Sequence, residues 1–366
     1  MPTEKPYANL IRSDIADMAP YTPILPFDVL SRRLNIAPEN IIKLDANENP
    51  YGPSPRVYQA LADETYYHIY PDPDSTSLRD ALSEYVGVDA THIVAGHGAD
   101  ELIDLIIRLF IVPGDAVINC PPTFGMYRFD TELNGGKIID IARNEDFSLD
   151  TESIVSQVDN DTDIKLIFVT SPNNPDGSIL DDACLRKLLA LPLIVVLDEA
   201  YIEFAGGSRA NWVPEHENLI VLRTFSKWAG LAGLRVGYGI FPQWILSHLL
   251  KIKQPYNVNV AGTTAALASL SDVHHLKENV QKIVAERERL YRALEAFDFL
   301  KPYPSEANFI FSRVIGKDAA ELKAALAKRG ILIRYFNTPG LQDHVRMSVG
   351  TPTQTSLLLE TLSTIE

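Results

Sequence analysis

The sequence predicts an α/β protein with two domains: a large domain built on a mostly parallel seven-stranded sheet, and a smaller α+β domain at the C-terminal end. Seven short apolar runs alternate with helical segments between residues 93 and 240. These runs are continuous in Val, Ile and Leu, as expected of strands that are covered on both faces. A second succession of helices and strands follows Pro255, which marks the predicted boundary.

The N-terminal segment, residues 1–28, is predicted to be an extended arm, because Pro20, Pro23 and Pro26 leave little room for a long helix. A short helix is expected at residues 27–34. The large domain is assigned to residues 29–255. Its strands are expected at residues 93–95, 116–119, 137–140, 165–169, 193–197, 219–222 and 235–240.

The smaller domain is assigned to residues 256–366 and is expected to begin with a long amphipathic helix at residues 274–299. Strands at residues 307–312, 331–334 and 344–349 follow, with a helix at residues 318–329 and a last helix from about Thr353. Helices and a sheet in this order are typical of an α+β domain.

Composition limits the classes of function. The 366 residues carry a net charge of −15 without a basic block, which argues against nucleic acid or an anionic membrane surface as a partner. No apolar run is long enough to span a membrane. Cys120 and Cys184 form neither a metal-binding pattern nor a disulfide framework. With no signal or transit peptide pattern at the N-terminus, these features predict a cytoplasmic enzyme that binds no metal.

Lys227 is the first candidate catalytic residue. It follows an apolar run and a short polar turn, and a Gly-rich segment leads from it to Arg235. Burial and a neighbouring cation both disfavour the ammonium form, so such an amine is suited to attack a carbonyl and form a Schiff base. A solvated loop lysine is the alternative reading of this residue alone.

Two other strand ends carry polar residues. Asp198 ends the run at residues 193–197, where an open α/β sheet binds ligands at the carboxyl ends of its strands. A helix N-cap is the simpler explanation of this aspartate. Asn174 lies in a Pro/Asn/Gly turn after the run at residues 165–169, and turn chemistry alone would account for it.

Gly96 and Gly98 precede a helical segment, so backbone N–H groups there are free to cradle a phosphate. A tight strand–helix turn is the alternative. Glu101 occupies the third position of the dinucleotide-binding pattern, which requires glycine, and a nicotinamide dehydrogenase is therefore disfavoured.

Together these residues define a pocket for one cofactor. The helix start and Arg235 are suited to a phosphate, Asp198 to a protonated ring nitrogen, and Lys227 to an imine. Asn174 and Tyr201 are suited to a ring hydroxyl. This set matches pyridoxal 5′-phosphate.

The order of these motifs resembles the fold-type I aminotransferases, and within them the histidinol-phosphate aminotransferases, over essentially the whole chain. The most specific motifs lie around Lys227. The segments that carry the resemblance are residues 44–55, 70–73, 98–103, 122–127, 172–175, 198–201, 223–235, 255–259, 307–309 and 345–351.

The resemblance implies a role for each matching residue. Lys227 is the lysine bound to the cofactor and, once released, the catalytic base, and Asp198 pairs with the pyridinium nitrogen. The other cofactor contacts that it implies are Asn174 and Tyr201 at the ring oxygen, Phe124 on the ring face, and Ser226, Arg235, Gly98, Ala99 and Asp100 at the phosphate. It further implies a homodimer in which Tyr70 reaches the partner's cofactor phosphate. The substrate-binding residues that it implies are Tyr21, Asn47, Arg334 and Arg346.

The chain departs from the family pattern at two positions. Phe124 stands where tyrosine is frequent, and Asp176 replaces the usual threonine, which is expected to bring an extra carboxylate near the cofactor loop. The implied reaction is transfer of the amino group of histidinol phosphate to 2-oxoglutarate, giving imidazole acetol phosphate and glutamate. An aromatic amino-acid aminotransferase and a phosphothreonine decarboxylase-like enzyme are alternatives. A non-catalytic regulatory module is disfavoured because no basic or helix-turn-helix-like region precedes Leu44.

Overall fold

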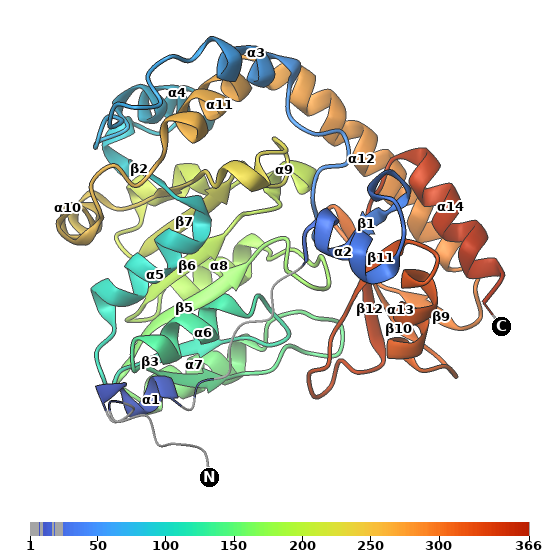
Figure 1. Cartoon of the computed structure of the whole chain (residues 1–366). Coiled ribbons are helices and arrows are strands. Elements are labelled where there is room, and N and C mark those ends of the chain that lie inside the picture. The colour runs from blue at the N-terminus through green and yellow to red at the C-terminus, as the bar shows by residue number, and fades with distance from the viewer. Residues whose placement is uncertain (1–6, 8–9, 17, 19–24, 366) are drawn as a thin grey trace.

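The computed structural model describes residues 7, 10–16, 18 and 25–365. The described residues form two sheets with helices around them (Figure 1). The helices are α1 (Ser13–Ala16), α2 (Phe27–Leu34), α3 (Pro55–Asp63), α4 (Thr76–Val86), α5 (Gly98–Phe110), α6 (Met126–Leu133), α7 (Thr151–Asn160), α8 (Asp182–Leu189), α9 (Ile202–Ala205), α10 (Gln243–Ile252), α11 (Val260–Leu270), α12 (Val273–Leu294), α13 (Ala319–Ala327) and α14 (Pro352–Ser363).

The large sheet has seven strands, as the apolar runs predict, and their order is β2-β8-β7-β6-β5-β3-β4. Its strands are β2 (Ile93–Gly96), β3 (Ala116–Asn119), β4 (Lys137–Asp140), β5 (Ile164–Thr170), β6 (Ile194–Asp198), β7 (Leu219–Thr224) and β8 (Gly237–Ile240). Strand β8 pairs antiparallel with both β2 and β7, whereas the other pairs are parallel. The carboxyl ends of β3, β5, β6 and β7 therefore meet at one edge.

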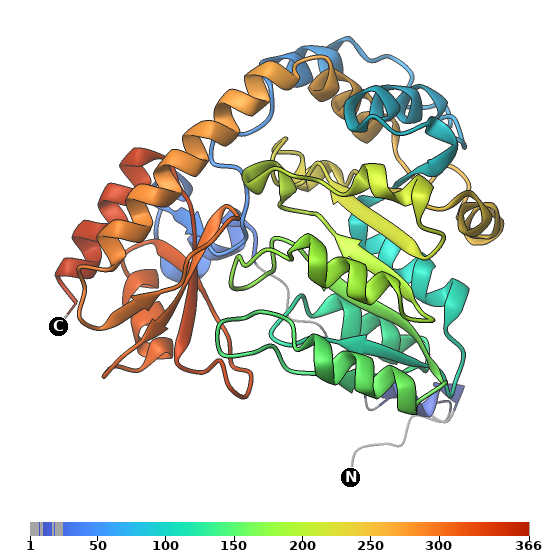
Figure 2. The same cartoon turned by 180° about the vertical axis from the view of Figure 1, so that it is seen from behind.

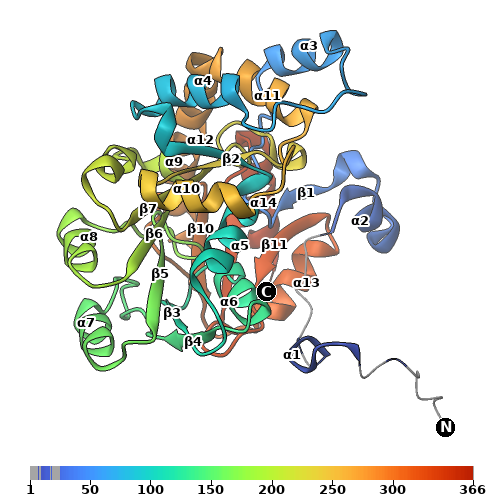
Figure 3. The ribbon, with the colours of Figure 1, turned by 90° about the vertical axis from the view of Figure 1, so that its left-hand side faces the viewer.

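Helices cover both faces of the large sheet, which explains why its central strands consist mainly of apolar residues. Helices α7 and α8 lie on one face and α5 and α6 on the other (Figure 3). Every residue of β7 is buried, including Arg223 and Thr224 at its end. A fully buried strand has no solvent-facing positions, so its sequence shows no polar alternation.

The second sheet has five strands in the order β1-β11-β12-β10-β9. They are β1 (Ile42–Leu44), β9 (Leu300–Pro302), β10 (Phe309–Val314), β11 (Ile331–Tyr335) and β12 (His344–Ser348). Strand β1 lies within residues 29–255, yet it pairs parallel with β11 of this smaller sheet. A three-residue strand carries too weak a pattern to indicate its partner.

Helix α12 connects the two parts of the molecule. It runs from the end near α3 and α11 to α14 beside the smaller sheet (Figures 1 and 2). Helix α11, which follows the predicted boundary at Pro255, packs against α3 and α4 of the large domain. One continuous group of buried apolar side chains includes residues of both sheets, such as Leu197 and Phe309. The boundaries at residues 28 and 255 stay predictions.

Candidate functional site

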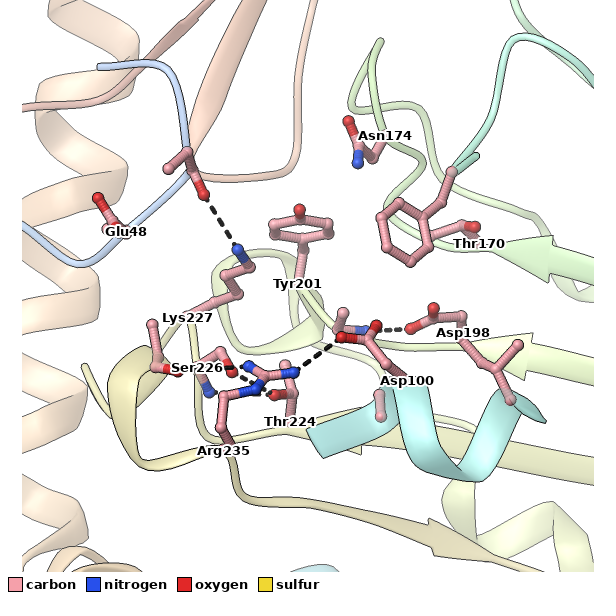
Figure 4. Close-up of a pocket in the computed structure, with 16 residues that line it drawn as sticks. Glu48, Asp100, Thr170, Asn174, Asp198, Tyr201, Thr224, Ser226, Lys227 and Arg235 are labelled. Carbon is pink, nitrogen blue, oxygen red and sulfur yellow. Dashed lines mark hydrogen bonds and ion pairs between the residues drawn. The ribbon is translucent and has the colours of Figure 1, made fainter. Parts of the chain in front are cut away.

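A cavity of about 180 Å³ lies where β5, β6 and β7 end and α5 begins (Figure 4). Polar side chains converge on it from these separate elements because parallel strands end at the same edge. The residues predicted to surround a cofactor line it together: Ala99, Asp100, Phe124, Asn174, Asp198, Tyr201, Ser226, Lys227 and Arg235.

Lys227 extends from the turn after β7 toward residues 45–48, and its Nζ donates to the backbone oxygen of Ala46 at 3.1 Å. Burial, together with the positive charge of Arg346, lowers the pKa of Lys227 to about 8. A solvated loop lysine would keep its ordinary pKa, so this environment favours the nucleophilic reading.

Asp198 ends β6 and is 3% exposed. Burial raises the pKa of its carboxyl group to about 6, and a hydrogen bond from the Tyr127 hydroxyl opposes this rise. Tyr127 donates to Oδ2 at 2.7 Å, and the backbone N–H of Ala200 donates to Oδ1 at 3.0 Å. Asp198 thus makes the hydrogen bond to a nearby backbone N–H that is expected of a helix cap, and it also lines the cavity. A buried carboxylate of this kind favours a cationic partner.

Arg235 and the closely packed start of α5 form the opposite end of the cavity. Arg235 lies over the start of α5, and a Cβ at Gly98 would come within 2.5 Å of its Nη2. Gly98 also has a φ of +77°, which glycine adopts without strain. Arg235 Nη2 pairs with Asp100 Oδ2 at 2.7 Å, so an anion bound here would compete with the Asp100 carboxylate. Ser226 is held nearby by a hydrogen bond from Thr224 Oγ1 at 2.9 Å.

The cavity wall beside Lys227 contains a series of polar side chains that are joined by hydrogen bonds. Tyr201 Oη accepts from Nδ2 of Asn47 at 3.0 Å, and Oδ1 of Asn47 accepts from Ser348 Oγ at 2.9 Å. Asn47 was predicted to bind substrate. It lines the larger neighbouring cavity but is 1% exposed, and its side chain holds Tyr201 in place. Asn174 Oδ1 accepts a hydrogen bond from Arg346 Nη1.

A second cavity, of about 470 Å³, adjoins the first and shares Phe124, Asn174, Tyr201 and Lys227 with it. Arg334 and Arg346, predicted to bind a substrate anion, both line it. They are direct partners on β11 and β12, so the sheet register places the two guanidinium groups side by side. Arg346 also donates to the backbone oxygen of Asp45 at 2.8 Å.

Three sequence expectations fall elsewhere. Tyr21 lies outside the described residues. Tyr70 is 80% exposed, stacks on Tyr256 with ring centroids 4.7 Å apart, and does not line either cavity of its own chain. The Asp176 carboxylate is buried within its own turn, where it accepts from Ser178 N at 2.8 Å and from the side chain of Asn173. Asp176 therefore closes the turn and does not line either cavity.

Sequence reasoning assigned no role to Tyr127 and Thr170, which surround Asp198. Tyr127 is fully buried on α6, and its hydroxyl lies 2.8 Å from Thr170 Oγ1 as well as contacting Asp198. Their one sequence signal is position: Thr170 ends β5, and Tyr127 lies three residues after Phe124, in the first turn of α6.

Among the residues that the structure describes, no helix has the length and apolar character needed to cross a membrane. Within the same part of the chain, no cluster of three or more His, Cys, Asp or Glu side chains is arranged to hold a metal ion.

Comparison with known proteins gives three consistent findings. The family model for aminotransferase class I and II matches residues 39–362. The histidinol-phosphate aminotransferases of Nicotiana plumbaginifolia (chloroplastic) and Roseiflexus castenholzii are 54% and 52% identical to this chain, covering 96% and 98% of it and 86% and 98% of their own lengths. The crystal structure of histidinol-phosphate aminotransferase from Sinorhizobium meliloti, in complex with pyridoxal-5′-phosphate, superposes with a TM-score of 0.86 at 29% identity and covers 96% of both chains.

Proposed function

This chain belongs to the class I and II aminotransferase family, and we propose that it transfers the amino group of histidinol phosphate to 2-oxoglutarate, with pyridoxal 5′-phosphate as cofactor. The products are imidazole acetol phosphate and glutamate, a step of histidine biosynthesis. The names of relatives that are 52–54% identical over nearly the whole chain support this substrate over an aromatic amino acid or phosphothreonine.

The residues of the smaller cavity fit this cofactor. Asp198 would pair with the ring nitrogen, because a buried carboxylate gains from a cationic partner. Asn174 and Tyr201 would contact the ring oxygen, and Phe124 the ring face. Arg235, Ser226 and the start of α5 would hold the phosphate, and the narrow contact between Gly98 and Arg235 supports this placement.

When bound, the cofactor supplies an electron sink for the carbanion at the substrate Cα. The protein supplies the proton transfer. Lys227, whose pKa burial lowers to about 8, has a much larger neutral fraction near neutral pH than an exposed lysine. Its amine can therefore take a proton from the substrate Cα, hold it and give it up again. Asp198, held by hydrogen bonds from Tyr127 and Ala200, would keep the ring nitrogen of the bound cofactor protonated.

The observation that carries the substrate assignment is the pairing of Arg334 with Arg346 in the wall of the larger cavity. One arginine suffices for the carboxylate of a plain amino acid. Two adjacent guanidinium groups match a dianionic phosphate, because each contact to a doubly charged group is charge-assisted. In the second half-reaction the same pair would hold the carboxylates of 2-oxoglutarate.

Steady-state kinetics with histidinol phosphate, histidinol and phenylalanine test the proposal. The parent enzyme should prefer histidinol phosphate, and Arg334→Gln should raise KM for it about tenfold or more, because a hydrogen bond to a charged group is lost. The KM for histidinol should change little. Arg313→Gln is a matched control, since Arg313 lies on β10 of the same sheet and pairs with Asp343 away from both cavities. A preference for phenylalanine would instead support the aromatic aminotransferase.

We further propose that the enzyme acts as a homodimer in a reducing compartment such as the cytoplasm. Tyr70 supports the dimer, because it is exposed and lines neither cavity of its own chain. Cys120 and Cys184 are both free thiols, as a reducing compartment requires.

A further inference from the structure

A series of three buried side chains, joined by hydrogen bonds, connects the smaller sheet to the cofactor cavity. Ser348 ends β12, two residues after Arg346, and is buried. The side chain of Asn47 lies between Ser348 and Tyr201 and contacts both. The proposed reaction gives Tyr201 a role at the ring oxygen of the cofactor, but it gives no role to Ser348.

The backbone of Asn47 is held in an unusual conformation. Its φ is +56°, in the left-handed region that residues other than glycine seldom occupy. The backbone N–H of Asn47 donates to Ser348 Oγ at 2.9 Å, and the backbone oxygen accepts from Nδ2 of Asn308 at 3.0 Å. Backbone conformations of this kind persist where the surrounding structure holds them, and they are frequent in functional sites. Ser348 and Asn308 thus fix the position from which the Asn47 side chain extends.

Ser348 also determines which way the Asn47 amide points. The Ser348 hydroxyl has one proton and already accepts from the backbone N–H of Asn47, so its own proton requires an acceptor. The Asn47 side chain lies 2.9 Å from Oγ. If the NH₂ group of Asn47 faced Ser348, the buried hydroxyl proton would have no acceptor among the described residues, which is costly in the interior. Oδ1 of Asn47 therefore faces Ser348, and Nδ2 faces Tyr201.

The orientation of Asn47 in turn directs the proton of Tyr201. Tyr201 Oη accepts from Nδ2 of Asn47 at 3.0 Å, so the hydroxyl proton of Tyr201 points elsewhere. Burial raises the pKa of Tyr201, which keeps the hydroxyl protonated at neutral pH. Tyr201 lines both cavities, and Figure 4 shows its hydroxyl between Lys227 and Asn174. The proton is therefore available to a ligand in the cavity.

We propose that Ser348 is a positioning residue, which acts through Asn47 to direct the Tyr201 hydroxyl toward the ring oxygen of pyridoxal phosphate and so stabilises negative charge on that oxygen. This inference rests on the proposed function, in which Tyr201 contacts the ring oxygen. With the opposite orientation of Asn47, Oδ1 would accept the Tyr201 proton, and two acceptor oxygens would face each other in the cavity. A hydrogen bond to a charged oxygen is about twice as strong as one between neutral groups, so this orientation affects the acidity of the bound cofactor.

The visible absorbance of the bound cofactor, followed as a function of pH, tests this role. A donor at the ring oxygen favours the deprotonated cofactor, so losing the donor should move the titration midpoint upward. Tyr201→Phe should raise the midpoint by about one pH unit or more, and Ser348→Ala by a comparable amount. Ser348→Thr keeps a hydroxyl and should restore the parental midpoint. Ser312→Ala is the matched control and should leave the midpoint unchanged, since Ser312 is buried on β10 of the same sheet and lines neither cavity.

Combining two changes separates positioning from a general structural effect. If Ser348 acts through Tyr201, a chain with both Ser348→Ala and Tyr201→Phe should have the midpoint of Tyr201→Phe alone. A further rise in that chain, or an unchanged midpoint in Ser348→Ala or in Tyr201→Phe, would overturn the role of Ser348. Ser348→Cys, whose thiol is a weak donor, gives the same comparison if the alanine variant does not fold, with a midpoint between those of the parent and Tyr201→Phe. If the parent protein gives no visible band with pyridoxal phosphate, the proposed function itself is wrong.

Discussion

At the scale of single residues, burial destabilises the charged forms of both Lys227 and Asp198. It therefore lowers the pKa of the lysine and raises the pKa of the aspartate. Lys227 loses part of its tendency to be charged, because water is excluded and Arg346 is close. Asp198 is also destabilised as an ion, but hydrogen bonds from Tyr127 and Ala200 partly offset the effect of burial on its pKa. The site is thus suited to a neutral amine beside a carboxylate that requires a cation.

The cofactor-free protein should react with aldehydes through Lys227 with a pH midpoint near 8, well below the ordinary lysine value of 10.5. The neutral amine is the reactive form, so the rate rises as pH passes the pKa. Arg346→Met removes a cation that lowers this pKa and should shift the midpoint upward. The rate of borohydride-trapped adduct formation measures it, with Lys227→Ala as the blank. A midpoint near 10.5 in the parent would contradict the buried placement.

Lys227→Ala should also abolish transamination, because it removes both the covalent anchor and the base. Turnover at near-parental kcat in this variant would refute the proposed mechanism.

Tyr127→Phe should weaken cofactor binding through its effect on Asp198. The lost hydrogen bond raises the pKa of Asp198 above about 6, so the carboxyl group stays protonated to a higher pH and pairs less well with a cationic ring. We expect Kd for pyridoxal phosphate to rise about tenfold near that pKa and to recover as pH increases. Absorbance titration across the pH range gives Kd. A purely structural role of Tyr127 would change Kd equally at every pH.

Asp198→Asn provides the comparison for that experiment. The amide keeps the shape of the side chain but cannot stabilise a protonated ring nitrogen. This variant should bind the cofactor and lose most of its kcat. If kcat stays within a few-fold of the parent, Asp198 acts as a helix cap.

At the scale of elements, a buried ion pair anchors the segment that carries Lys227. Arg223 lies near the end of β7, and its Nη2 is 2.5 Å from Oε1 of Glu203 on α9, with both side chains less than a tenth exposed. The ring of Tyr85 on α4 lies 5.4 Å from the guanidinium carbon. Strand β7 and helices α4 and α9 therefore contact one another at Arg223, next to the turn that leads to Lys227.

Glu203→Leu should lower the free energy of unfolding by about 3–5 kcal/mol, because it leaves the Arg223 charge buried without its main partner. Denaturant unfolding measures the change. Asp28→Asn is the matched control: it breaks the Arg32–Asp28 pair on α2, which is more than two-thirds exposed, and should cost less than about 1 kcal/mol. Similar effects of the two variants would show that the Arg223–Glu203 pair is not a major source of stability.

At the scale of the whole molecule, the two sheets share one apolar core, and the site lies where they meet. The smaller cavity contains residues of the large sheet, whereas Arg334 and Arg346 come from the smaller sheet. Strand β1, the segment at residues 45–48 and helix α12 cross between the two parts. Substrate specificity therefore depends on how the two sheets are held relative to each other.

Tyr70 leads to a test of the dimer. If it completes the partner's phosphate site, Lys227→Ala and Tyr70→Phe chains, each with low activity alone, should form heterodimers with one intact site when mixed. Activity should then exceed the sum of the two separate variants. Tyr58→Phe, at an exposed tyrosine on α3, is the control. When it is mixed with Lys227→Ala, the total activity should not exceed the sum of the activities of the two separate variants. A fully active monomer in sedimentation would refute the dimer.

The sequence by itself determined the strands of the large sheet and the ends at which its polar residues lie. Continuous apolar runs predict buried strands. Asp198 follows one such run directly, and Lys227 follows another after a short polar turn, so the local pattern was sufficient. The family resemblance added Arg334 and Arg346, which the register of β11 and β12 then places side by side.

The tertiary structure alone decided the partners of these residues. It joined β1 to β11, used Asn47 to hold Tyr201, and placed Tyr127 against Asp198, 71 positions away in the chain. The physical reason is that periodicity and turn chemistry act between neighbours in sequence, whereas hydrogen-bond partners and pKa values depend on which distant segments share a buried space.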